Sequence, residues 1–250
     1  MSTENQAGRL TLVPLVTRGF EVFLQNFRSM LPLVLIYLPF LLVINYLSAR
    51  SNQTNDVKSI ESLVEIYFLL LIVLAMIFLS VIPSMAIIKM VESAELGTTM
   101  NWQDALRHAV ARWSSSILTM LIMMLIVFGL TLLLVVPGII WEVYYVFAIN
   151  VVSLRSLSGK AALDYSKRLV KGQWWRVVGY GLAVGIGVVI VQIPVNLIAS
   201  FLPLSPLAAL INAAAGSLVY LFTTIVFTLF FLNLEAMKED KGGAEVSPET

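Results

Sequence analysis

Six apolar runs, each about as long as a bilayer is thick, take up most of this sequence. They lie at about residues 30–48, 63–90, 115–136, 138–154, 177–201 and 207–234. A helix needs roughly 20 apolar residues to cross the hydrocarbon core of a membrane. With 59% hydrophobic and 12% charged residues, the chain is too apolar for a water-soluble domain. The sequence therefore predicts an all-α polytopic membrane protein, with one six-span domain over residues 1–237.

Positive charge is gathered on one side of these predicted spans. Six spans place both termini on the same side, and fourteen Lys and Arg residues fall there: three before the first span, three between the second and third, six between the fourth and fifth, and two in the tail. The opposite side carries two, Arg50 and Lys58. Connections rich in Lys and Arg stay in the cytoplasm. We expect both termini to be cytoplasmic and the polar residues 238–250 to form a disordered tail.

Three amphipathic segments are predicted on the cytoplasmic side, at residues 12–28, at 101–113 and within the connection 155–176. They are expected to lie in the membrane interface. In the third, the helical period places basic side chains on one face and Ala162, Tyr165 and Leu169 on another. A basic helix beside a membrane attracts anionic headgroups by about 1 kcal/mol per cation. The candidate headgroup-binding residues are Lys160, Lys167, Arg168, Lys171 and Arg176. Plain anchoring of the chain is the alternative interpretation.

Four polar residues fall inside the predicted spans. Glu142 is the one carboxylate well inside a span, and intramembrane carboxylates are expensive and often functional. It could bind a cation or substrate group, or reach interfacial water near the start of its helix. Gln192, Asn196 and Asn212 could form a site beside the Pro194 kink, as in some transporters. Hydrogen bonding between helices is their alternative role.

Turn and packing signals add further expectations. Pro137 and Gly138 are predicted to form the turn between the third and fourth spans. Gly181 and Gly185 are expected to support close helix packing within the chain, with dimerisation as the alternative. His108 is the only histidine and is expected to be solvated on the second amphipathic segment.

The residue inventory narrows the function classes. The chain has no cysteine, which excludes a thiolate metal site and a cysteine nucleophile. Acid and base catalysis needs paired titratable groups, and the spans offer one carboxylate. We therefore expect no enzyme activity, no cofactor, no metal and no nucleic-acid partner.

A short motif resembles one known group of membrane proteins. Its residues are Val136 to Ile139, followed by Ala161, Ala162, Leu163, Ser166, Leu169, Lys171, Gly172 and Trp174, with Asn26 and Phe27 as a weaker mark. These resemble six-span bacterial proteins that include YciC-type inner-membrane proteins and the membrane domain attached to some glycerophosphodiester phosphodiesterases. The resemblance implies a six-span fold in the bacterial inner membrane. It implies no reaction, because phosphodiesterase activity there belongs to a separate soluble domain. Such proteins often carry arginine soon after the Pro-Gly pair, where this chain has Glu142.

The sequence favours a non-enzymatic membrane protein that supports envelope organisation or lipid homeostasis through its basic cytoplasmic residues. The alternative is a transporter or channel for a small solute that uses the intramembrane polar residues. Anionic membrane lipids are the expected partners. A homo-oligomer or a second membrane protein stays open as a further partner.

Overall fold

The computed structural model describes residues 12–51, 60–201 and 205–241, and this part of the chain is helical without any strand. The helices are α1 Leu12–Ser51, α2 Ile60–Glu95, α3 Trp102–Ala111, α4 Trp113–Leu133, α5 Val135–Tyr145, α6 Ala148–Arg155, α7 Gly159–Val170, α8 Trp174–Ser200 and α9 Ser205–Lys241. The predicted all-α class is confirmed for these residues.

Five helical stretches of the described residues are long and apolar enough to cross a membrane. They are Leu70–Glu95, Trp113–Leu133, Val135–Arg155, Trp174–Ser200 and Leu207–Glu239. In α4 and α8 only 11% and 6% of the apolar stretch is buried within the chain, so their apolar side chains point outward. A helix that is apolar all round and exposed needs lipid or another apolar surface around it. This architecture is consistent with a multi-pass membrane protein.

The N-terminal region differs from its predicted division. Residues 12–28 and 30–48 were expected to be an interfacial helix and a separate span, yet α1 is one helix through both. No glycine, proline or capping residue pattern separates Arg28 from Met30, and Met30 is buried, so nothing ends the helix there. The side chains of residues 44–51 lie outside the described residues.

The C-terminal end of the chain also differs from the prediction of a tail beginning at residue 238. Helix α9 continues through this point and ends at Lys241. Lys238 donates to the carbonyls of Arg168 and Lys171, which ties the last turn of α9 to the end of α7. Residues 242–250 lie outside the described residues, so the predicted disorder is untested there.

The turn between α4 and α5 was predicted at the wrong residues. Leu134 alone leaves the helical conformation, with φ −158° and ψ 130°. Pro137 and Gly138 lie inside the first turn of α5. Proline is tolerated there because the first amides of a helix have no partner within it. Gly138 serves another purpose, since a Cβ at this residue would lie 3.1 Å from the Thr131 Cα on α4.

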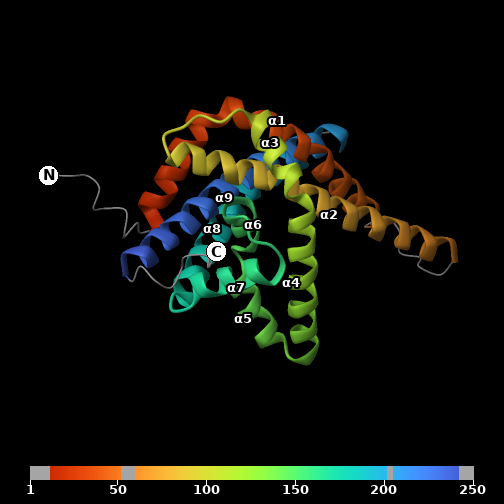
Figure 1. Ribbon diagram of the computed structural model, residues 1–250. Coiled ribbons are helices and arrows are strands. Elements are labelled where there is room, and N and C mark those ends of the chain that lie inside the picture. The colour runs from red at the N-terminus through yellow and green to blue at the C-terminus, as the bar shows by residue number, and fades with distance from the viewer. Residues whose placement is uncertain (1–11, 52–59, 202–204, 242–250) are drawn as a thin grey trace.

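A central core joins the helices, and the hairpins extend from it. The core consists of buried side chains from α1, α2, α3, α6, α7, α8 and α9, with Phe147 from the turn before α6; the largest include Met85, Leu169, Phe230 and Phe231. The pair α4 and α5 points down and away from this core in Figure 1, whereas the first half of α2 points to the right. Helix α1 packs most extensively against α9. The core therefore brings chain segments from all three predicted hairpins to one place.

Gly97 ends α2 in a left-handed conformation, with φ +71°. Behind it, the Thr98 amide donates to the Ser93 carbonyl at 2.9 Å, which is the bond of a Schellman cap. We expect Gly97→Ala to lower the free energy of unfolding by about 1 kcal/mol, because an L side chain resists this conformation. An added Cβ would contact nothing within 4 Å, so no steric effect is mixed in. Thermal unfolding in detergent measures it. Gly179→Ala, at an ordinary helical position with equally open space, is the control and should not destabilise.

Candidate functional site

Helix α7 presents part of the predicted basic surface. Its inner face is fixed in the core, with Ala162, Tyr165 and Leu169 all at most 4% exposed. Its start is held where the Gly159 amide donates to the Thr119 hydroxyl at 2.7 Å. The outward side chains that remain exposed are Lys160, Arg168 and Lys171. The inner face of α7 is therefore packed in the protein core, and its exposed cations lie on the outer side of the helix.

Three of the five predicted headgroup residues lie against aromatic rings. The Arg168 guanidinium lies 5.7 Å from the centre of the Tyr165 ring. The Lys167 Nζ lies 4.2 Å from the centre of the Trp141 ring. The Arg176 guanidinium lies 5.6 Å from the Tyr180 ring, and its Nη1 is 3.0 Å from the Met237 sulfur. Cations held over rings keep their charge while their side chains lose freedom. Lys167 and Arg176 are half-buried, whereas Lys160, Arg168 and Lys171 are exposed.

Arg155, at the start of the same connection, belongs to a different site. Its Nε and Nη2 bind the two oxygens of Glu235 at 3.0 and 2.6 Å, a bidentate pair. Its Nη1 binds Glu92 at 2.8 Å, and Lys89 binds the other oxygen of Glu92 at 2.7 Å. Glu92 and Glu235 are 8% and 4% exposed. We call Lys89, Glu92, Arg155, Tyr165 and Glu235 the charge cluster; it joins α2, α6, α7 and α9.

Tyr165 completes the charge cluster from α7. Its hydroxyl donates to the Glu235 Oε1 at 2.5 Å. Burial and the adjacent Glu235 carboxylate both raise the pKa of Tyr165 above its usual range. The phenol therefore stays protonated and donates at any physiological pH. Within the cluster two cations balance two carboxylates, which indicates a structural role rather than an acid and base pair.

The end of α6 is closed by side chains from α3. Arg112 donates to the Val152 carbonyl at 3.1 Å and to the Ser156 hydroxyl at 2.6 Å. The His108 Nε2 lies 2.8 Å from the Ser153 carbonyl. The prediction that His108 is simply solvated was therefore wrong. The last carbonyls of a helix lack partners within it, and these two side chains supply them.

The predicted intramembrane polar residues are not brought into one site. Glu142 is exposed on α5, Asn196 is exposed on α8, and Gln192 and Asn212 are half-buried on α8 and α9. The Gln192 Oε1 and Asn212 Oδ1 atoms are buried without a hydrogen-bond partner among the described residues. The two glycines expected to pack closely are also open, because a Cβ at Gly181 or Gly185 would meet nothing within 4 Å. Close packing of this pair within the chain was thus wrongly predicted.

Sequence reasoning missed the charge cluster. Glu92 and Glu235 lie one or two residues after the predicted spans 63–90 and 207–234, and no role was predicted for them. The signal that could have found them is their position, since each carboxylate comes within two residues of the end of a long apolar run. Among the described residues, no three His, Asp or Glu side chains lie together as a metal site would require.

Comparison with known proteins assigns the chain to one family. No curated protein and no solved structure matches the chain. One family profile, described as Domain of unknown function (DUF7847), matches residues 50–237. The matched region runs from the start of the first polar connection to the last turns of α9, and it contains the charge cluster and α7. Because it covers well over half of the sequence, the chain belongs to the DUF7847 family.

Proposed function

We propose that this chain is a non-enzymatic, six-span protein of a bacterial inner membrane that organises anionic lipid around a basic cytoplasmic surface. The observation that supports it is the exposed set Lys160, Arg168 and Lys171 on α7 and its end. In this proposal both termini are cytoplasmic, and α3 and α7 lie at the cytoplasmic interface. The role served is membrane organisation or lipid homeostasis.

The geometry of α7 favours this function over simple anchoring. An anchoring helix buries its apolar face in lipid, whereas the apolar face of α7 is buried in the protein core. The backbone of α7 that carries the cations is therefore held by the protein core and needs no bound lipid to be ordered. Asp164, half-buried on the same helix, offsets part of the positive charge. Each exposed cation is worth about 1 kcal/mol towards an anionic surface.

Lipid enrichment around the reconstituted protein tests the proposal. The protein is placed in mixed anionic and zwitterionic bilayers, extracted with its surrounding lipid in polymer discs, and the lipid ratio is measured by mass spectrometry. We expect the wild type to enrich anionic lipid and Lys160→Gln with Arg168→Gln to lose most of that enrichment. Raising salt to 1 M should also reduce it, because the screening length falls to about 3 Å.

Arg107→Gln is the matched control, because the Arg107 charge on α3 is offset by its ion pair with Asp104 at 3.4 Å. It should leave the ratio unchanged. Equal enrichment in the wild type and the double variant, insensitive to salt, would rule out the basic surface of α7 as the cause.

A small-solute transporter is the second candidate, favoured by the unpaired oxygens of Gln192 and Asn212. Buried amide oxygens without partners are costly and can indicate a ligand site. The described cavities between α5 and α8 and among α1, α8 and α9 are instead lined by apolar side chains and do not include these amides. Solute flux into proteoliposomes that falls in Gln192→Leu, at unchanged protein abundance, would favour this candidate over the first.

A further inference from the structure

We infer that the cleft between α5 and the start of α8 binds one acyl chain of an anionic phospholipid. This inference rests on the proposed function, to which it adds a defined binding site. The cleft has a volume of about 430 Å³, within the usual size of small-molecule sites. It is lined by Val136, Ile139, Ile140, Tyr144, Trp174 and Trp175.

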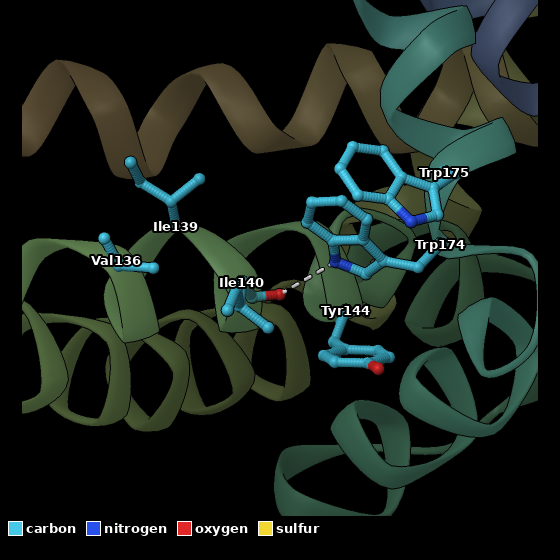
Figure 2. Close-up of a pocket in the computed structure, with 6 residues that line it drawn as sticks. All are labelled: Val136, Ile139, Ile140, Tyr144, Trp174 and Trp175. Atoms are coloured by element: carbon cyan, nitrogen blue, oxygen red, sulfur yellow. Dashed lines mark hydrogen bonds between the residues drawn. The ribbon is translucent and has the colours of Figure 1, made fainter.

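The aromatic wall of the cleft is held in place. Gly172, with φ +84°, follows α7 and turns the chain into α8. The Trp174 Nε1 then donates to the Ile140 carbonyl at 3.5 Å across the cleft (Figure 2). The Trp174 and Trp175 rings meet edge to face with their centres 4.7 Å apart. This hydrogen bond to α5 and the contact between the two rings hold the aromatic wall in place without a ligand.

The lining calls for a hydrocarbon occupant. Apart from the tyrosine hydroxyl and indole nitrogens, the side chains of the cleft are apolar, and Figure 2 shows both indoles facing α5. Trp175 remains 80% exposed at the cleft, where an amphipathic ring is suited to a membrane interface. Water in such a cleft would forgo hydrogen bonds, whereas an acyl chain contacts the walls on both sides.

The positive charges beside the cleft favour a phospholipid with an anionic headgroup. The segment that joins α5 and α6 to α8 carries Lys167, Arg168 and Lys171. Lys167 lies over Trp141, whose ring centre is 6.1 Å from that of Tyr144 in the cleft wall, and Lys171 precedes Trp174 by three residues. Glu142 on α5 and Asp164 on α7 are the acidic side chains of these two helices, so the three cations outnumber the carboxylates. A chain in the cleft therefore places an anionic headgroup near positive charge.

The second large apolar groove lacks this feature. It lies among α1, α8 and α9 and has a volume of about 450 Å³. Arg18, the cation of the α1 segment that lines it, is already paired with Glu21 at 3.0 Å and Glu95 at 2.9 Å. Charge complementarity therefore favours the cleft at α5 and α8 as the lipid site.

Native mass spectrometry of the full chain in detergent tests the inference, with phosphatidylglycerol and phosphatidylcholine as the two probes. We expect one phosphatidylglycerol to stay bound after detergent removal. Ile139→Trp fills the cleft and Trp175→Ala removes an exposed wall; each should weaken binding about tenfold. Lys171→Gln should weaken it about fivefold, by loss of one cation. Ile190→Trp, at a similarly exposed isoleucine of α8 outside the cleft, is the control.

Three results would overturn the inference: equal binding in Ile139→Trp and Ile190→Trp, full binding in Trp175→Ala, or equal retention of the two lipids. Failure of the proposed function is distinguishable through Lys160→Gln. This change should reduce lipid enrichment in discs but leave the single retained lipid in place. A retained lipid that depends on Ile139 would therefore support the cleft even if the surface of α7 did not enrich anionic lipid.

Discussion

Replacing Arg155 with methionine is expected to lower the free energy of unfolding by about 3 kcal/mol. The change leaves the Glu92 and Glu235 carboxylates buried without their shared cation. This loss lies at the lower end of the range measured when one partner of a buried ion pair is removed. The Arg155 side chain is 30% exposed, and after the change Lys89 still contacts Glu92 and Tyr165 still contacts Glu235. Thermal or denaturant unfolding in detergent measures the loss.

Two comparisons separate this effect from loss of any arginine. Arg107→Met removes an exposed pair with Asp104 and should change stability by at most about 0.5 kcal/mol. Adding Glu235→Gln to Arg155→Met should recover part of the loss, since one uncompensated charge is removed. A loss as small as that of Arg107→Met would mean that the charge cluster contributes little to the fold.

Gly138→Ala is expected to destabilise the α4 and α5 hairpin by about 1–3 kcal/mol through overpacking. An added Cβ would lie 2.1 Å from the Thr131 Oγ1 and 3.1 Å from the Thr131 Cα. A hydroxyl can rotate, but the backbone of α4 can yield only if the two helices separate. Unfolding in detergent and cross-linking between cysteines placed on the two helices would both report the change.

Gly129→Ala is the matched control in the same hairpin. Its added Cβ would contact nothing within 4 Å, and alanine favours a helix over glycine by up to about 1 kcal/mol. Equal stability of Gly138→Ala and Gly129→Ala would show that the hairpin tolerates wider spacing at this point.

Helices were predictable from this sequence because apolar runs of membrane length leave few alternatives. Their boundaries were less so. Pro137 looked like a turn residue, yet a proline in a first helical turn loses no hydrogen bond. Gly138 was predicted to be part of the same turn, yet its lack of a side chain instead lets Thr131 of α4 pack closely against α5. Local composition does not distinguish a glycine that turns the chain from one that admits a neighbouring helix.

The exposed and buried cations could not be separated from sequence alone. Lys160 and Arg155 belong to one basic connection, and the sequence offers no local reason to treat them differently. The partners of Arg155 lie 63 and 80 residues away, at Glu92 and Glu235. Only the packing of α2, α6 and α9 brings them together. The six-span topology, its orientation and the resemblance to YciC-type proteins stay predictions.

The charge cluster also has a consequence for biogenesis. Glu235 lies in α9, which is synthesised after α2 and α6 with their Glu92 and Arg155. Until α9 packs, Lys89 and Arg155 contact a single carboxylate, and the charge cluster holds one surplus positive charge. Packing of α9 neutralises that charge through Glu235. A chain that stops before α9 would therefore keep an unbalanced charge between α2 and α6.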